Sequence, residues 1–298
     1  MRVIVLFPGA LGDLCLLAPA LATIAARGVR VELSIQRSLA PVASMLLPSV
    51  VLAPPIDGAV MATLFADEVD PSLRQWLRGA DRLYAWLARG NADGRLSVRF
   101  GELGVSADLY AVPRTDGERH VGEEYAAALG LAGPGILPRA VPPPAVTTAL
   151  PWRRAGAVRL LVHPGAGARA KRWAAHGFRW VADTWKEAGG EAAVLLGPAE
   201  EEDAGSWKAD GYDPLTGLSI LDAARLIASA PVWIGNDSGV SHLAGALGSR
   251  GVVLFGPTRP QRWSPLGGGL TMVEFHGRST DAVTREVLAI LGVPFTAP

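Results

Sequence analysis

The 298-residue sequence has little of what marks secreted, nucleic-acid-binding or membrane-spanning proteins. Its single cysteine, Cys15, excludes an internal disulfide and favours a reducing compartment, with the thiol in a buried apolar role. Net charge is zero, and residues 1–150 hold 13 basic and 14 acidic residues, so nucleic-acid binding is not expected. No apolar run reaches the roughly 18 residues of a membrane span. We expect a cytoplasmic protein.

The N-terminal segment resembles a secretion signal in composition but not in continuity. An early arginine precedes an apolar run, yet Pro8, Gly9 and Gly12 interrupt that run, which is continuous in a signal peptide. A buried strand, a glycine turn and a helix explain the same residues.

Further along, apolar runs alternate with helical patterns. The runs lack polar alternation, which is typical of parallel strands covered on both faces. Expected strands span residues 2–7, 29–35, 50–53, 82–87, 107–113, 158–166 (with the strand's exit), 192–197, 232–235 and 252–256. Expected helices span residues 13–26, 117–131, 177–189, 199–209, 219–230, 235–248 and 280–292.

The proline-rich residues 137–156 predict a linker between two domains. We therefore expect an α/β protein with two Rossmann-like, doubly wound parallel-sheet domains, residues 1–150 and 151–298, facing each other across a cleft. The last helix, 280–292, is a candidate to pack back on the first domain.

The first candidate for chemistry is the loop after the first strand. Gly9 and Gly12 permit a sharp turn, and Asp13 then stands at a helix start, at the carboxyl end of a strand where open α/β sheets bind ligands. The glycine spacing does not match the dinucleotide fingerprint. Asp13 is either a helix N-cap or a functional carboxylate.

A second glycine-rich loop covers residues 163–173. The chain has 25 arginines but only 3 lysines, so Lys171 in this loop is unusual. A compact ammonium beside exposed backbone N–H groups suits a phosphate. The alternative is a solvated loop lysine.

The third candidate is residues 235–248, where a helix begins directly after a strand. Free N–H groups and the helix dipole favour a pyrophosphate there. Asp237 beside an anion should bond a hydroxyl or an amide. His242 lies four residues after Ser238, on one predicted helix face, and is either a site residue or a buried or capping histidine. A Ser/His/Asp hydrolase is disfavoured, because the G-x-S-x-G motif is missing.

Several polar residues carry weaker signals. The carboxylates of residues 200–203, at a helix start after a strand, either complement the helix dipole or include one that bonds ribose hydroxyls. Thr258 follows another strand and either reaches a phosphate or builds a turn. Arg74, Arg78 and Arg82 form either a solvated face or a platform for an acidic acceptor. No Cys/His cluster or D-x-D motif is present, so no metal or other cofactor is expected.

Taken together, the motifs resemble the heptosyltransferase family, glycosyltransferase family 9. The resemblance implies a GT-B fold, whose second domain holds a nucleotide-sugar donor. Phe7 departs from it, because some members of the family carry a basic residue there. The matching segments are residues 9–21, 163–173, 194–201, 233–248 and 252–260.

By this resemblance, Asp13 is the catalytic carboxylate, Lys171 binds the donor phosphates and Glu200 lies near the donor ribose. The implied reaction is inverting, metal-independent transfer of a heptose from ADP-heptose to a lipopolysaccharide-core acceptor. Such an acceptor allows at most peripheral contact with the inner face of the inner membrane. Donor-binding residues expected besides Lys171 and Glu200 are Asp237, Ser238, Gly239, His242 and Thr258.

Two other functions stay open from the sequence. One is a nucleotide-sugar epimerase or hydrolase, which would convert the donor without an acceptor. The other is a non-catalytic nucleotide-sugar-binding protein, which would keep the donor loop and yield no product.

Overall fold

A computed structural model gives the fold of the chain. Part of the expected linker, residues 137–139 and 143–149, lies outside the described residues, so the domain limits 1–150 and 151–298 stay a prediction. The described residues are 1–88, 94–136, 140–142 and 150–294.

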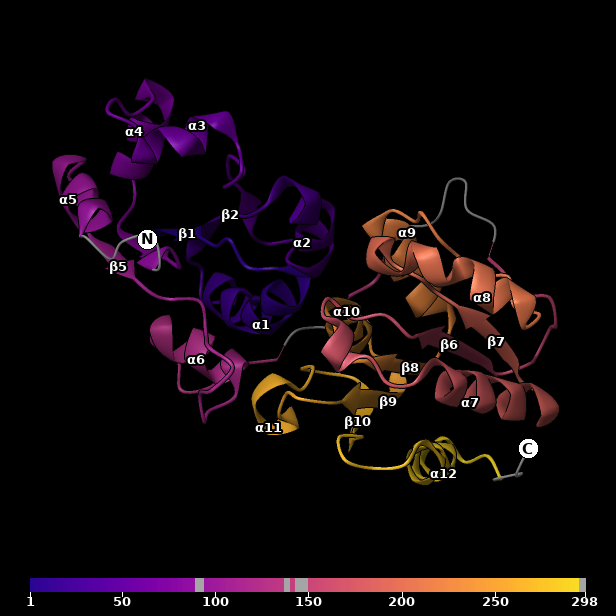
Figure 1. Cartoon of the computed structure of the whole chain (residues 1–298). Helices are drawn as coiled ribbons and strands as arrows, with labels where there is room; N and C mark the ends of the chain where they lie inside the picture. The colour runs from indigo at the N-terminus through magenta and orange to yellow at the C-terminus, as the bar shows by residue number, and fades with distance from the viewer. Residues whose placement is uncertain (89–93, 137–139, 143–149, 295–298) are drawn as a thin grey trace. The chain divides into compact units, whose positions relative to one another are not determined.

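The chain divides into two compact units, residues 1–137 and 138–298. The first is built on a parallel five-stranded sheet with the order β3-β2-β1-β4-β5 (Figure 1). Its central strand β1 is apolar and almost wholly buried, which is expected where helices cover both faces. The strands are β1 (Arg2–Leu6), β2 (Arg30–Ser34), β3 (Val51–Leu52), β4 (Arg82–Ala85) and β5 (Ala107–Leu109).

Successive side chains of β1 point to opposite faces of the sheet, and helices cover both faces. Ile4 and Leu6 join a buried cluster with side chains of α3, α4 and α5. Helix α1 packs on β2 and on α6. The helices are α1 (Leu11–Ala26), α2 (Ala40–Leu46), α3 (Ala59–Ala62), α4 (Pro71–Arg78), α5 (Arg95–Glu102) and α6 (Val121–Ala128), with 3₁₀ turns η1 (Arg37–Leu39) and η2 (Thr63–Phe65).

The second unit repeats this plan, with the parallel strand order β10-β9-β8-β6-β7. Strand β8 is buried along its whole length between β9 and β6. The strands are β6 (Arg159–His163), β7 (Glu191–Val194), β8 (Val232–Asn236), β9 (Arg250–Phe255) and β10 (Gly269–Glu274).

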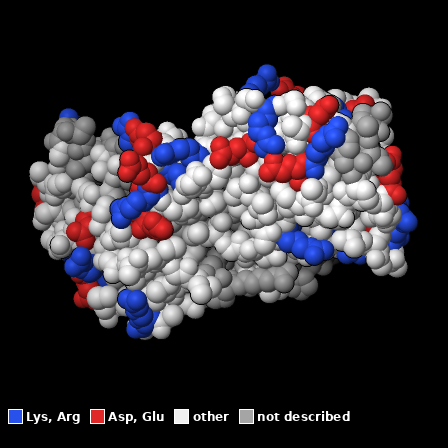
Figure 2. Space-filling view, turned by 90° about the horizontal axis from the view of Figure 1, so that it is seen from below, with Lys and Arg blue, Asp and Glu red and all other residues white. Residues whose placement is uncertain are grey.

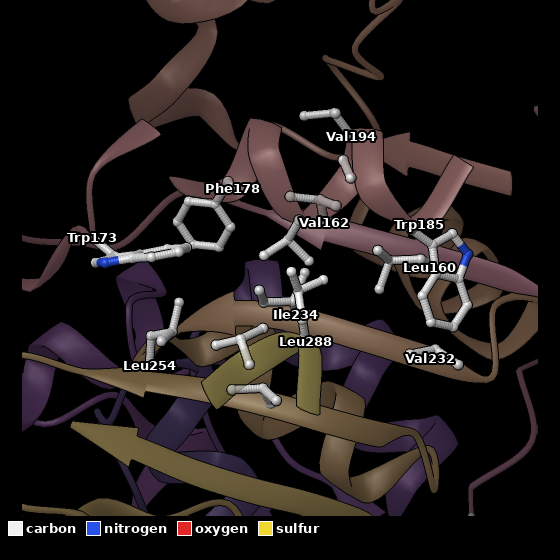
Figure 3. Packing of buried hydrophobic residues seen from close by; sticks show 14 of the residues in the cluster. Leu160, Val162, Trp173, Phe178, Trp185, Val194, Val232, Ile234, Leu254 and Leu288 are labelled. Atoms are coloured by element: carbon white, nitrogen blue, oxygen red, sulfur yellow. The ribbon is translucent and has the colours of Figure 1, made fainter. Parts of the chain in front are cut away.

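The main core of this unit lies between the sheet and helices α7, α8 and α12 (Figure 3). Trp173 and Phe178 fill one end of the core, with ring centroids 5.1 Å apart, and Trp185 fills the other. Helix α12 packs on α7, β9 and β10. The helices are α7 (Ala175–Glu187), α8 (Ala204–Ala209), α9 (Ile220–Ser229), α10 (Gly239–Ala246), α11 (Pro260–Trp263) and α12 (Thr280–Leu291), with 3₁₀ turns η4 (Arg169–Lys171) and η5 (Pro198–Asp203).

Several expected elements need correction. Strand β10 and helices α2, α3, α4, α5 and α11 were not expected from the sequence. Strand β10 is an edge strand in which only Val273 is buried, so it lacks the apolar run that marks its neighbours. The expected helix 199–209 is a 3₁₀ turn followed by α8. Ser219 is the N-cap of α9, and its Oγ accepts a hydrogen bond from Asp222 N at 3.2 Å.

Surface charge is mixed rather than segregated. On the face drawn in Figure 2, acidic and basic side chains lie interspersed among uncharged ones, with no broad field of one sign. None of the helices in the described part of the chain is both long and apolar enough to cross a membrane.

Candidate functional site

Three loops of the second unit meet at the carboxyl ends of neighbouring strands. Strands β6, β8 and β9 are adjacent in the sheet, and residues 164–173, Asp237 and residues 256–259 follow them. Open α/β sheets bind their ligands at this edge. The structure brings Lys171, Asp237 and Thr258, one from each loop, into direct contact.

The Asp237 carboxylate is the centre of this cluster and is only 4% exposed. Its Oδ2 accepts hydrogen bonds from Lys171 Nζ at 2.8 Å and from Thr258 Oγ1 at 2.6 Å. The expectation that Asp237 bonds a hydroxyl is therefore confirmed. The Lys171 side chain stays 30% exposed, so the buried carboxylate holds an ammonium that solvent can reach.

Helix α10 begins beside this cluster. Ser238 is its N-cap, and the Ser238 hydroxyl accepts a hydrogen bond from Ser241 N at 3.3 Å. Ser238 thus precedes the helix that contains His242, which corrects the expected shared helix face. Gly239 is the first helical residue, and the buried His242 has its Nε2 4.0 Å from Asp237 Oδ1. The positive end of the helix dipole therefore lies next to Lys171 and Asp237.

Glu200 is buried under the glycine loop. Its Oε1 accepts a hydrogen bond from Arg172 Nη2 at 2.8 Å, and a Cβ on Gly165 would stand 2.4 Å from Glu200 Oε2. Burial raises the pKa of Glu200, although the Arg172 charge and backbone hydrogen bonds with Ala166 and Gly197 act in the opposite direction. The negatively charged group that contacts the backbone of this loop is therefore the Glu200 carboxylate, which lies against Gly165 and has a backbone hydrogen bond with Ala166.

His163, the last residue of β6, lies at the same sheet edge. Its Nδ1 is 2.9 Å from the carbonyl oxygen of Leu195, which assigns the proton of the neutral ring to Nδ1. Burial is the main cause that lowers the pKa of His163, to about 4. The ring is therefore neutral at physiological pH.

In the first unit, Asp13 is the third residue of α1, and Ala10 occupies the N-cap. The N-cap alternative for Asp13 is thereby corrected. The Asp13 carboxylate accepts hydrogen bonds from Ala10 N at 3.2 Å and from the Tyr125 hydroxyl at 2.9 Å. Tyr125 is fully buried in α6, so it fixes Asp13 from a second element.

Gly9 is required here by close packing. A Cβ on Gly9 would lie 2.4 Å from Phe7 Cε1 and 2.8 Å from Asp13 Cβ. The Phe7 ring packs edge-on against Tyr125 at 5.4 Å and Trp86 at 5.5 Å between centroids. Phe7 is therefore part of an aromatic core beneath Asp13. Gly12 lies in the first turn of α1.

The three arginines expected to bind an acceptor are not gathered at the carboxyl edge of the first sheet. Arg82 begins β4, at the amino edge, and its Nη2 lies 3.1 Å from Asp108 Oδ2. Arg78 ends α4 and donates through Nε to the Leu103 carbonyl at 3.3 Å. Arg74 lies one turn earlier on α4. An acceptor role for these arginines stays a prediction.

Cys15 is buried in α1, and burial raises the pKa of its thiol to about 12. Its expected apolar role is confirmed. Within the described ranges, no cluster of three or more His, Cys, Asp or Glu side chains is placed to hold a metal ion.

Three residues that shape these loops were not singled out from the sequence: Tyr125, His163 and Asn236. Each acts through a contact distant in sequence, such as that between Tyr125 and Asp13, which are 112 positions apart. The one local signal was for Asn236, which stands beside Asp237 at a strand end. The other two look like ordinary helix and strand residues.

Two parallel five-stranded α/β units of this kind define the GT-B fold, and solved structures share it. E. coli ADP-heptose lps heptosyltransferase II is 20% identical, with 98% of each chain covered and a TM-score of 0.72. E. coli heptosyltransferase WaaC with ADP is 16% identical, with 97% of this chain and 99% of that chain covered and a TM-score of 0.67. The iron-containing dodecameric glycosyltransferase TibC from enterotoxigenic E. coli is 17% identical, covering 91% of this chain and 62% of that chain, with a TM-score of 0.58.

Sequence comparison names the family. Residues 147–287, which lie in the second unit, match the model of glycosyltransferase family 9 (heptosyltransferase). The resemblance recognised in the sequence is confirmed. No curated protein matches the sequence significantly.

Proposed function

We propose that this protein is a glycosyltransferase that transfers a sugar, a heptose, from an ADP-linked donor to a lipopolysaccharide-core or related glycan acceptor. The observation that carries the proposal is the contact of Lys171 and Thr258 with Asp237, beside the start of α10. This cluster lies in the domain that matches family 9. Two proteins of the same fold are described with ADP or as an ADP-heptose enzyme.

In this proposal the donor diphosphate binds across the start of α10. The solvent-accessible ammonium of Lys171 and the N–H groups at the start of α10, near Gly239, stabilise the negative charge that builds up on the diphosphate as its bond to the sugar breaks. Asp237 holds Lys171 and Thr258 in place, and His242 and the Ser238 cap line the same turn. An ammonium and a helix N-terminus take the part that a metal takes in other transferases, so the proposed transfer needs no metal. Glu200, held by Arg172, lies beside the ribose.

Asp13 is the proposed base. It takes the proton of the acceptor hydroxyl while that oxygen bonds to the anomeric carbon and ADP leaves from the opposite side, which inverts the configuration. Tyr125 and the Ala10 N–H orient the Asp13 carboxylate. A carboxylate accepts several hydrogen bonds, so these two donors are compatible with a third. The proposal requires that the two units bring Asp13 to the bound sugar.

The proposed site of action is the cytoplasm, with at most peripheral contact at the inner face of the inner membrane, where a lipid-linked acceptor would be present. Arg74, Arg78 and Arg82 are the proposed contacts. Reversal of their charge should lower activity on a lipid-bound acceptor more than on a soluble one. Equal activity on both acceptors would remove this part of the proposal.

Calorimetry with ADP and ADP-heptose, followed by a transfer assay with lipopolysaccharide core, tests the function. Asp13→Ala should lower kcat by about 10²- to 10⁴-fold, the usual size of general-base catalysis, and leave the donor Kd nearly unchanged. Asp116→Ala removes an exposed carboxylate of the same unit and is the matched control, which should behave as wild type.

The remaining outcomes separate the alternatives. Sugar released or epimerised from the donor alone would indicate a hydrolase or epimerase. Tight nucleotide binding with no product from any acceptor would indicate a binding protein. No binding of any nucleotide sugar would refute the proposal.

A further inference from the structure

One buried side chain joins both ends of the glycine loop that carries Lys171. Asn236, the last residue of β8, has no exposed surface. Its Oδ1 accepts a hydrogen bond from Trp173 N at 3.0 Å, and its Nδ2 donates to the Pro164 carbonyl at 2.7 Å. Pro164 directly follows β6, and only Ala174 separates Trp173 from the start of α7. A single amide therefore closes the loop between these elements.

The chemistry of the two partners determines which way the amide points. A backbone N–H on one side must face an oxygen, and a backbone carbonyl on the other must face an NH₂ group. Among side chains of this size only asparagine offers both at this spacing. Aspartate would keep the bond from Trp173 but would set a carboxylate oxygen against the Pro164 carbonyl.

Asn236 is itself anchored on the strand. Its backbone carbonyl accepts a hydrogen bond from Ser241 Oγ at 2.6 Å, which connects it to the first turn of α10. The C-terminal end of the loop is also held in place, because the Trp173 ring is buried in the core against Phe178. The amide thus links the rigid end of β8 to both ends of a loop rich in glycine and alanine.

Lys171 lies two residues before Trp173, and the residue after Asn236 is Asp237, which binds the Lys171 ammonium at 2.8 Å. The same strand end therefore sets both the path of the loop and the position of its lysine. If the amide were lost, the loop ends could separate, and Lys171 would no longer be held at the start of α10.

We propose that Asn236 is a positioning residue, which places the Lys171 ammonium for the diphosphate of the donor. The inference rests on the proposed function only in taking the diphosphate as the partner of Lys171. The placement of Lys171 itself can be measured without any ligand.

Because the chain has only three lysines, reductive methylation with ¹³C-formaldehyde gives three lysine signals in an NMR spectrum, alongside that of the N-terminus. Lys171→Arg identifies the signal of Lys171. In Asn236→Ala and Asn236→Asp, the Lys171 signal should move to the position of a solvent-exposed lysine, such as Lys208. The signal of Lys186, paired with Asp183, should stay in place. An unchanged Lys171 signal in both folded variants would overturn the inference.

Calorimetry with ADP supplies the second measurement, as a double-mutant cycle. Asn236→Ala and Lys171→Ala should each weaken ADP binding at least about tenfold, the size of one charge-assisted hydrogen bond. Asn236→Ala should add nothing in the Lys171→Ala background. Thr284→Ala, which removes one buried hydrogen bond in α12, controls for lost stability and should leave the Kd unchanged.

The outcomes distinguish this inference from the proposed function. If the Kd for ADP in the double variant rose by the product of the two single-variant factors, Asn236 would not act through Lys171. That result would overturn the inference. A wild-type protein that binds no ADP, but whose Lys171 signal moves in the Asn236 variants, would refute the proposed function and support the positioning role.

Discussion

Gly165→Ala is the sharpest test of how the glycine loop and Glu200 fit together. The new Cβ would lie 2.4, 2.5 and 2.9 Å from the Oε2, Cδ and Oε1 atoms of Glu200, all closer than real contacts allow. The carboxyl is buried and bound to Arg172, so it cannot swing away without loosening that ion pair. Overpacking costs about 1–3 kcal/mol, and loss of a buried ion-pair partner about 3–5 kcal/mol.

Partial relief of the clash should therefore leave Gly165→Ala about 2–3 kcal/mol less stable than wild type, near the upper end of the overpacking range. For a domain of this size, that corresponds to a fall in Tm of about 4–12 °C. Gly167→Ala is the matched control in the same loop, because nothing lies within 4 Å of its Cβ. It should melt at or slightly above the wild-type temperature, since alanine restricts the unfolded chain.

Thermal unfolding followed by circular dichroism measures both variants. The same substitution is then made in a Glu200→Ala background, where the contact partner is missing and the loss of Tm should largely disappear. The reasoning would be refuted if Gly165→Ala and Gly167→Ala melted alike, or if Gly165→Ala cost as much without the Glu200 carboxylate.

Three further predictions follow from the buried polar groups. Tyr125→Phe removes the hydroxyl that orients Asp13, and should lower kcat by about tenfold in the transfer assay without changing the ADP Kd measured by calorimetry; an unchanged kcat would contradict it. His163 has a folded-state pKa near 4, below its ordinary 6.5, so its contribution to stability is full above pH 6.5 and declines as pH falls toward 4. Between pH 6.5 and 4 the Tm of His163→Gln should fall less than the Tm of wild type. Parallel curves of Tm against pH for the two proteins would contradict this contribution of His163. Cys15, with a thiol pKa near 12, should react with a thiol reagent at neutral pH only after unfolding in urea, and rapid labelling of the native protein would show that the thiol is accessible.

The repeating pattern of strand, loop and helix was visible in the sequence because buried parallel strands must be apolar throughout. Strands β1, β6, β8 and β9 could be predicted in this way. Strand β10 could not, because Gly269, Thr271 and Glu274 break up its apolar residues, so it shows no continuous apolar run. Helices α2, α3, α4, α5 and α11 have only four to eight residues each, too few to show the apolar repeat by which longer helices were recognised.

The candidate residues Asp13, Lys171 and Asp237 were identified from the sequence for a related reason. Polar residues concentrated at glycine-rich strand ends stand where open α/β sheets bind ligands, so residue type and position single them out. Chain order also placed Lys171 and Asp237 at the ends of strands in one sheet.

Their partners were decided by tertiary structure alone. Tyr125 reaches Asp13 from 112 residues away, and Asn236 reaches Trp173 from 63 residues away. Such contacts depend on which strands are neighbours and on where buried donors and acceptors must be paired, and neither is encoded in a local pattern. The sequence determined which groups stand at the strand ends, whereas only the packing of the folded chain determined what holds each of them in place.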